Sequence, residues 1–397
     1  MKLSQKGEQL SPSITLAITA KAKEMKSRGV DVVSFGVGEP DFNTPSNIIK
    51  AAIKAMEEGK TKYTPAAGIS ELKKAIIKKL KEDNDLIYNE SQVIISTGAK
   101  QCLANLFLAI LNPGDEVLLP VPYWVSYPEL VKLADGNPVF VECLQEDGYK
   151  FNIDTLEKYV TEKTKAILIN SPNNPTGTIY TKEELIELGE FAKKHDLFII
   201  ADEIYEKLIY GDYKHISIGS LSEDAYNRTI VINGMSKSYA MTGWRVGYAA
   251  GPKEVIKIMS SIQSHMTSNV STIGQYAALE ALEGPQDELH DMIKVFHSRR
   301  DLMVKLLDDI NDLDYIYPQG AFYVMVDIKK LIGKSIDSVV IKDSLTFSDM
   351  LLEKEKVAVV PGIGFGLENY IRLSYATSND AIMEGIKRIK SFTLALN

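Results

Sequence analysis

TKAILINSPNNPTGTIYTKEELIELGEFAKKHDLFIIA, residues 164–201, is the stretch that decides the fold. Its two ends, 164–170 and 197–201, carry apolar runs that are typical of strands buried on both faces. Between them, residues 181–196 have helical apolar spacing and begin with a threonine that is followed three residues later by a glutamate. That pattern predicts a capped helix N-terminus. A strand, a helix and a strand in this order predict a parallel βαβ unit.

The same alternation of strand and helix continues on both sides of this unit. Further strands are predicted at residues 92–97, 115–120, 137–143, 229–232 and 245–251. Further helices are predicted at residues 99–112, 125–136 and 152–162. The sequence therefore predicts an α/β fold with a mostly parallel, doubly wound sheet.

The pattern changes after residue 285. The elements predicted there are helices at 285–310 and 379–392 and strands at 320–328, 357–362 and 370–377. A chain of 397 residues is too long for one ordinary core. We therefore expect a large domain at 46–285 and a smaller α+β domain at 286–397. Residues 1–45 are expected to pack on the small domain or on a partner subunit.

Composition narrows the class of protein. A net charge of −8 argues against a nucleic-acid partner. No apolar run approaches the roughly 18 residues that a membrane span needs, and the N-terminal SITLAITA predicts an amphipathic helix rather than a signal peptide. Cys102 and Cys143 lack metal-like spacing and are expected to be buried, reduced thiols. We expect a cytoplasmic protein without a metal site and without membrane contact.

Four predicted strands are followed directly by polar or small residues. Gly98 and Ala99 come after the strand at 92–97, SPNNPTG after 164–170, Asp202 after LFIIA, and Lys237 shortly after TIVI. The carboxyl ends of parallel strands meet at one edge of a sheet, where ligands of such folds bind. The sequence therefore predicts a ligand site at this edge.

The residue types at this edge indicate the ligand's chemistry. Small residues that open a helix, here Gly98 and Ala99, predict an anion site. Asp202 could balance a cation, and a desolvated Lys237 could act as a nucleophile. Read singly, these residues could equally be a helix cap, a structural ion pair and a solvated lysine. Together they suggest pyridoxal 5′-phosphate, whereas the nucleotide-binding patterns Gly-x-Gly-x-x-Gly and Gly-Lys-Ser/Thr do not occur in these places.

A family resemblance rests on a set of motifs in a fixed order. The first set is SPNNPTG (171–177), DEIY (202–205), SKSYAMTGWRVGY (236–248) and RLSYAT (372–377). In that order they resemble the class I/II aminotransferases of PLP fold type I. The second set is GEPDFNTP (38–45), KYTPAAGISELKKAI (62–76), PYWVSYPE (122–129) and GAFYVMVDI (320–328). It narrows the resemblance, over about residues 10–395, to the bacterial and archaeal aspartate aminotransferases.

The resemblance implies roles around the cofactor ring. Lys237 would bind the cofactor covalently and then carry the proton that moves in the reaction. Asp202 would pair with the ring N–H, and Tyr205 and Asn174 would hydrogen-bond the ring's phenolate oxygen. Trp124 would stack on the ring and, with Asn174, lie beside the substrate. Lys237, Asp202 and Tyr205 are thus the implied catalytic residues.

The same resemblance implies how the phosphate is held. Arg245, Ser236 and the backbone of Gly98, Ala99 and Lys100 would bind it. Tyr63 would reach it from the second subunit of a homodimer whose active sites lie at the interface.

Many relatives carry a hydroxyl three residues before the lysine, and this chain has Gly234 there. Phosphate binding is therefore expected to depend more on Arg245 and on backbone N–H groups.

The resemblance also implies how the substrate is bound. Arg372 would hold the α-carboxylate bidentately, and Gly38 would add a backbone contact. Lys100 and Thr15 would bind a second carboxylate, which favours ping-pong transamination between L-aspartate or L-glutamate and their 2-oxo acids. Ser11 stands where relatives that use prephenate have a lysine, which weakens that specificity.

Alternative functions remain open on the sequence. The aminotransferase could have broad, aromatic, alanine or prephenate specificity. The same fold also supports C–S lyases, which release pyruvate and ammonia without an acceptor. A PLP-sensing regulator would carry an added DNA-binding domain, but only about 35 residues precede GVGEP and the chain is acidic.

Overall fold

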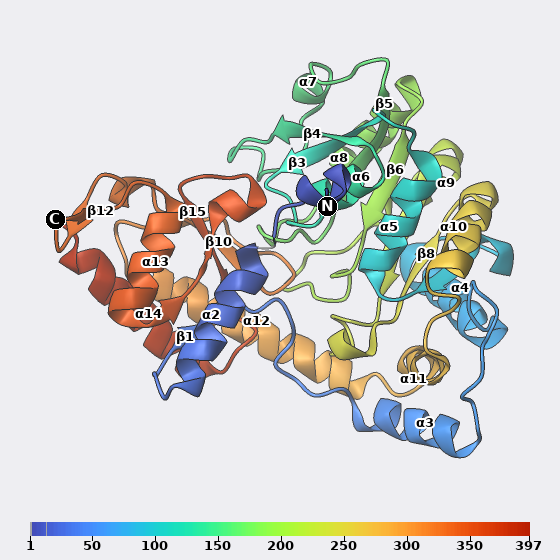
Figure 1. Cartoon of the computed structure of the whole chain (residues 1–397), viewed down its shortest axis with the longest axis horizontal. Coiled ribbons are helices and arrows are strands. Elements are labelled where there is room, and N and C mark those ends of the chain that lie inside the picture. The colour runs from blue at the N-terminus through green and yellow to red at the C-terminus, as the bar shows by residue number, and fades with distance from the viewer. Residues whose placement is uncertain (1, 13) are drawn as a thin grey trace.

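The computed structural model describes residues 2–12 and 14–397. The chain forms a larger body around a seven-stranded sheet and a smaller body around a four-stranded sheet (Figure 1). Helix α12 (Asp287–Leu307) runs from the larger body to the smaller one. Among the described residues, every helix is too short or too polar to cross a membrane.

The larger sheet is mostly parallel, as predicted. Its strands are β2 (Val93–Ser96), β3 (Glu116–Val121), β4 (Asn137–Glu142), β5 (Thr164–Asn170), β6 (Phe198–Asp202), β7 (Thr229–Gly234) and β8 (Gly247–Ala250). They are arranged in the order β2-β8-β7-β6-β5-β3-β4. Only β8 runs against its two neighbours, β2 and β7. The start of β8 therefore lies at the same edge as the carboxyl ends of the parallel strands.

Helices bury both faces of this sheet. One face packs against α5 (Ala99–Ile110), α6 (Tyr127–Leu133) and α10 (Lys253–Met266). The other face packs against α8 (Lys182–Lys194), α4 (Ser70–Asn84) and α11 (Thr272–Glu283). Side chains alternate between the faces, so that Leu168 enters the first core and Ile167 the second. Each fully buried side chain of this kind stabilises the fold by about 1.5–3 kcal/mol.

The remaining elements complete both bodies. They are α1 (Gln5–Glu8), α2 (Ile14–Ser27), β1 (Val33–Ser34), α3 (Ser46–Glu57), α7 (Ile153–Leu156), α9 (Glu223–Arg228), β9 (Asp314–Tyr315), β10 (Tyr323–Asp327), β11 (Ser335–Ile336), β12 (Val339–Val340), α13 (Ser344–Glu355), β13 (Val357–Ala358), β14 (Val360–Pro361), β15 (Tyr370–Ser374) and α14 (Asn379–Ala395).

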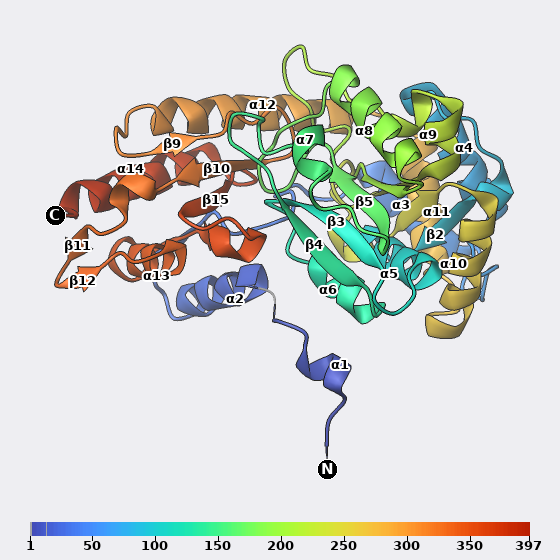
Figure 2. The same cartoon turned by 90° about the horizontal axis from the view of Figure 1, so that it is seen from above.

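The smaller body is built on an antiparallel sheet in the order β14-β15-β10-β9. Strand β1 pairs with β13, and α2 lies against this body (Figure 2). The chain before α2 reaches the larger body, where Lys6 pairs with Asp135 at 2.8 Å. Within one chain, the first 45 residues thus contact both bodies, and the domain limits stay a prediction.

One predicted helix is much shorter in the structure. The sequence predicts a helix at 152–162, but α7 ends at Leu156. The Thr161 hydroxyl donates to Glu116 at 2.6 Å, and the Thr161 N–H donates to the Thr164 hydroxyl at 2.8 Å. Side-chain hydrogen bonds of this kind compete with helix formation, and here they turn the chain into β5.

Candidate active site

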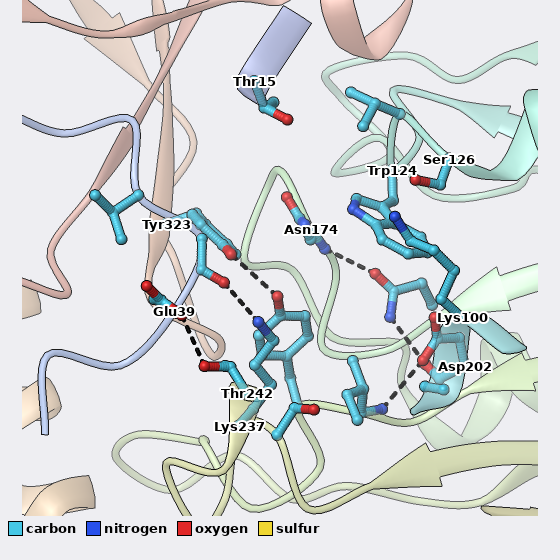
Figure 3. A pocket seen from close by; sticks show the side chains of 18 of the residues that line it. Thr15, Glu39, Lys100, Trp124, Ser126, Asn174, Asp202, Lys237, Thr242 and Tyr323 are labelled. Carbon is cyan, nitrogen blue, oxygen red and sulfur yellow. Dashed lines mark hydrogen bonds between the residues drawn. The ribbon is translucent and has the colours of Figure 1, made fainter. Parts of the chain in front are cut away.

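A cavity of about 450 Å³ lies at the carboxyl edge of the larger sheet, where the smaller body meets it (Figure 3). The structure brings twelve of the predicted site residues to its wall: Thr15, Gly38, Ala99, Lys100, Trp124, Asn174, Asp202, Tyr205, Ser236, Lys237, Arg245 and Arg372. Gly98 lies directly beneath Arg245. Tyr63 does not reach this cavity, because its side chain is 88% exposed on another surface.

Lys237 lies in the turn that follows β7. Its Nζ donates to the Gly38 carbonyl at 2.5 Å and lies 5.7 Å from the ring centre of Phe322. Burial lowers the pKa of Lys237 to about 8, and the Arg372 and Arg245 charges act in the same direction, while Glu39 opposes them. A considerable share of this amine is therefore uncharged near pH 8, which is the form that acts as a nucleophile.

Asp202 ends β6 and is almost fully buried. Its Oδ2 accepts from the Tyr127 hydroxyl at 2.7 Å, and its Oδ1 accepts from the Ile204 N–H at 3.2 Å. Burial raises the pKa of Asp202 to about 6, against the lowering effect of these two hydrogen bonds. The carboxylate is thus held in place and charged above pH 6, facing the cavity.

Arg245 precedes β8 and has a positive φ of 58°. Its Nη1 donates to the Thr242 carbonyl at 2.8 Å. A Cβ at Gly98 would lie 2.4 Å from Arg245 Nη2, so a side chain there would displace the guanidinium. Gly98 is also the N-cap residue of α5, whose first N–H groups have no partner within the helix. A cation and a helix N-terminus therefore meet at one point, which suits an anion.

The structure gives a physical reason for Gly234. A Cβ at this position would lie 2.8 Å from the Gly247 Cα and 2.9 Å from the Val246 carbonyl oxygen. The backbone of β8 thus occupies the space that a serine or threonine would need. Ser236, two residues on, is buried and lines the cavity.

Arg372 on β15 is a buried cation, with only 2% of its surface exposed. Its guanidinium donates to Asn174 Oδ1 at 3.0 Å and to the Gly36 carbonyl at 3.2 Å. It lies 4.2 Å from the ring centre of Tyr323. Within residues 2–12 and 14–397, Nε has no hydrogen-bond partner and no ion pair of Arg372 is found. Because an uncompensated buried charge is costly, this position suits an anionic ligand.

Tyr205 and Tyr323 join the two bodies at the cavity. Their hydroxyl groups lie 3.1 Å apart. Burial raises the pKa of Tyr205 well above its ordinary value, so its hydroxyl is protonated and can donate. The backbone N–H of Asn174 donates to Asn170 Oδ1 at 2.8 Å. This hydrogen bond fixes the loop that carries Asn174, whose side chain lines the same cavity as Tyr205 and Arg372.

Lys100 lies beside Trp124, with its Nζ 5.0 Å from the ring centre. Burial, together with the charge of Arg245, lowers the pKa of Lys100. Thr15 on α2 faces the cavity from the opposite wall (Figure 3). The cavity therefore has the cation Arg372 at one place and the cation Lys100 at another, which suits a ligand with two acidic groups.

Among the lining residues that sequence reasoning missed are four with polar side chains that make contacts in the site: Glu39, Tyr127, Thr242 and Tyr323. The Thr242 hydroxyl donates to Glu39 Oε2 at 2.7 Å. All four lie inside motifs that carried the resemblance, but nothing in the local pattern separates them from surface or core positions. Their roles depend on contacts between distant parts of the chain.

A buried ionic cluster lies behind the loop that carries Tyr205. His215 Nε2 lies 3.1 Å from Glu203 Oε2, and Lys79 pairs with Glu206. Asn84 donates to both glutamates, at 3.1 and 2.8 Å. Glu203, Glu206 and His215 are spaced closely enough for a metal ion. Lys79 and Asn84 already contact the carboxylates, however, so the group is accounted for as an ion-pair network.

This cluster makes stability depend on pH. Burial lowers the pKa of His215, but Glu203 and Glu206 outweigh burial and raise it above its ordinary value of 6.5. The stabilisation is therefore complete below pH 6.5 and is lost as the pH rises through the folded-state pKa. We expect His215→Gln to lower the free energy of unfolding by roughly 3 kcal/mol at pH 6 and by clearly less at pH 9, measured by denaturant unfolding.

A matched control is His195→Gln. His195 lies 3.1 Å from Glu157 near the surface, and such pairs contribute little to stability. Equal losses at pH 6 and pH 9 for His215→Gln would contradict a charged His215.

Comparison with known proteins identifies similar chains. The family model described as aminotransferase class I and II matches residues 30–389. The aspartate aminotransferase of Bacillus subtilis (strain 168) is 52% identical over 392 residues, covering 99% of each chain. The probable aspartate/prephenate aminotransferase of Aquifex aeolicus (strain VF5) is 48% identical, covering 98% of each chain.

Solved structures give the same result. The crystal structure of the aspartate aminotransferase from Rhizobium meliloti superimposes with a TM-score of 0.97 at 41% identity, covering 100% of both chains. The structure of the aspartate aminotransferase from Thermus thermophilus with maleate superimposes with a TM-score of 0.92 at 42% identity, covering 98% of this chain and 99% of that one.

Proposed function

The chain belongs to the class I and II aminotransferase family and is an aminotransferase, and from this premise we propose that it uses pyridoxal 5′-phosphate to transfer the amino group of L-aspartate or L-glutamate to a 2-oxo acid. One observation carries the choice of acidic substrates. Besides Lys237 and the proposed phosphate ligand Arg245, the cavity has two further cations at separate places, the buried Arg372 and Lys100.

The residues of the cavity fit the cofactor. Gly98 leaves room for Arg245 over the N-terminus of α5, which suits the phosphate. Asp202 keeps acceptor capacity beyond its bonds to Tyr127 and Ile204, which suits the ring N–H. Lys237 supplies an amine with a lowered pKa, which suits the covalent link. When bound, the cofactor supplies an electron sink.

Each residue then has a definite task. Asp202 would hold a proton on the ring nitrogen, and Tyr205 and Asn174 would donate to the ring's phenolate oxygen. Trp124, which lines the same cavity, would cover the ring face. Lys237 would carry the proton that leaves the substrate carbon, because a pKa of about 8 leaves a considerable share of its amine neutral near pH 8.

The substrate is held by groups at both ends. Arg372 would bind the α-carboxylate with the charge that no acid of the described chain neutralises, and Gly38 lines the same cavity. Lys100 and Thr15 bind the distal carboxylate. One solved relative is described with maleate, a dicarboxylate, and that agrees with two carboxylate positions.

We propose further that the active enzyme is a homodimer. Tyr63 is highly exposed and lies outside the cavity of its own chain. The exposed apolar residues Ile49, Ile53 and Met56 lie on one helix, α3, close in sequence to Tyr63. A second copy packed there would bring Tyr63 of the partner subunit to the phosphate.

The test of this function is an amino-donor panel. We expect oxaloacetate to form from L-aspartate only when 2-oxoglutarate is supplied. Release of pyruvate and ammonia from cysteine conjugates without an acceptor would instead identify a lyase. Prephenate and aromatic 2-oxo acids belong in the same panel, because some relatives carry prephenate in their names.

Substitution of Lys100 by alanine tests the acidic specificity. We expect the KM for L-aspartate to rise about tenfold, which corresponds to about 1.4 kcal/mol, because one charge contact to the distal carboxylate is lost. L-Alanine is the internal control, since it has no distal carboxylate and its KM should change less than twofold. A parallel rise for both substrates at saturating cofactor would exclude Lys100 as the specificity residue.

A further inference from the structure

We propose that Tyr127 is a positioning residue that holds the Asp202 carboxylate charged and directed at the ring nitrogen of the cofactor. This inference rests on the proposed function. It concerns a residue that would not touch the substrate and acts only through Asp202.

The contact between the two side chains is short and buried. The Tyr127 hydroxyl donates to Asp202 Oδ2 at 2.7 Å, and Tyr127 is 1% exposed and Asp202 4% exposed. The two residues are 75 positions apart, one on α6 and the other at the end of β6. The pairing is thus made by the fold and not by neighbouring sequence.

Tyr127 can serve only as a donor in this pair. Burial raises the pKa of the Tyr127 hydroxyl well above its ordinary value, and Asp202 adds to that effect. The hydroxyl therefore keeps its proton, and its hydrogen bond stabilises the carboxylate over the carboxylic acid. Without this bond, the main remaining influence would be burial, which favours the neutral acid.

A charged Asp202 matters because the ring nitrogen of the cofactor has to keep its proton. A carboxylate next to the ring N–H keeps that proton on the ring, whereas a carboxylic acid would compete as a donor. Of the two hydrogen-bond donors to the Asp202 carboxylate within the described chain, Tyr127 has the larger effect, since the Ile204 N–H donates to the other oxygen at a longer 3.2 Å. Lys237 is a second favourable charge, Glu203 disfavours the carboxylate, and Cys102 is a buried thiol whose raised pKa keeps it neutral.

Tyr127 also fixes a second wall of the cavity. Its ring packs edge-on against Trp124 at 5.3 Å between ring centres, and its remaining surface is enclosed in the core beneath α6. Phenylalanine keeps these ring contacts and removes only the hydroxyl. The substitution therefore separates the hydrogen bond from the packing.

The experiment compares two cofactors in two proteins. Apoenzyme of the wild type and of Tyr127→Phe is titrated with pyridoxal 5′-phosphate and with its 1-deaza analogue, in which carbon replaces the ring nitrogen. We expect Tyr127→Phe to raise the Kd of the natural cofactor roughly tenfold, the size of effect typical of a hydrogen bond to a charged group. The Kd of the analogue should change less than twofold, since that ring offers Asp202 no N–H.

The outcomes distinguish a Tyr127 that positions Asp202 from a Tyr127 that only supports the fold. Equal weakening of both cofactors would mean that Tyr127 only supports the structure, and an unchanged Kd for both would mean that the hydrogen bond has no effect. Either result overturns the inference.

A second pair of variants makes the same test without a buried carboxylate. In an Asp202→Asn background, adding Tyr127→Phe should leave the Kd of pyridoxal 5′-phosphate unchanged within twofold. A further loss there would contradict action through Asp202. Failure of the wild type to bind pyridoxal 5′-phosphate at all would refute the proposed function and is a separate result.

Discussion

Replacement of Lys237 by alanine is expected to abolish amino transfer and to remove the visible absorption of the protein with its cofactor. The expected loss in kcat is roughly 10⁴-fold or more, because one amine supplies both the covalent link and the proton transfer. Its surroundings support this expectation. Its pKa of about 8 leaves a considerable share of the amine neutral near pH 8, and the charges of Arg372, Arg245, Glu39 and Asp202 act on it.

The measurement combines a desalted spectrum with an aspartate-to-2-oxoglutarate assay. Lys100→Ala is the matched control, since that lysine lines the same cavity and its removal should leave the absorption in place. A protein that lacks Lys237 yet keeps the visible band after desalting would show that another amine holds the cofactor.

Replacement of Arg372 by methionine is expected to lower kcat/KM for L-aspartate roughly 10²–10³-fold. Loss of one partner from a buried, hydrogen-bonded charge pair typically costs about 2–5 kcal/mol. Lysine should rescue this only in part, because an ammonium cannot make the bidentate contact. The Kd of the cofactor should change much less than kcat/KM, since Asn174 is the one residue proposed to hold the cofactor that accepts a hydrogen bond from Arg372 among the described residues.

Arg372→Met should also leave the substrate-free protein no less stable. The guanidinium is buried, lacks an acidic partner among the described residues, and has a pKa lowered by burial. Replacing a buried charge by an apolar side chain of similar size is often neutral or stabilising. A large drop in Tm together with the loss of activity would mean that Arg372 supports the fold and would weaken its assignment to the substrate.

Much of the larger sheet could be predicted from the sequence because its strands are buried on both faces. The apolar runs at 164–170 and 197–201 became β5 and β6 within one residue of the expected limits. The positions of Asp202 and Lys237 at the sheet edge followed from the same pattern. Parallel strands place their carboxyl ends together whatever the side chains are.

Other parts depend on contacts that no local pattern reveals. The direction of β8, which brings Arg245 to the edge, is set by its pairing with β7 and β2. Tyr127 looked like a residue at the start of a helix, and its role comes from Asp202, 75 positions later. The shortening of α7 came from the hydroxyl of Thr161, whose acceptor on Glu116 is distant in sequence.

The contact between Arg372 and Gly36 has a consequence for how the molecule is made. The two residues are 336 positions apart, near opposite ends of the chain. Within one subunit, all the residues proposed to hold the cofactor have been synthesised once synthesis has passed residue 245, since chains grow from the N-terminus. The proposed contact with the substrate α-carboxylate becomes possible only after residue 372 has been synthesised. A nascent chain thus gains the means to take up its cofactor well before it can hold a substrate.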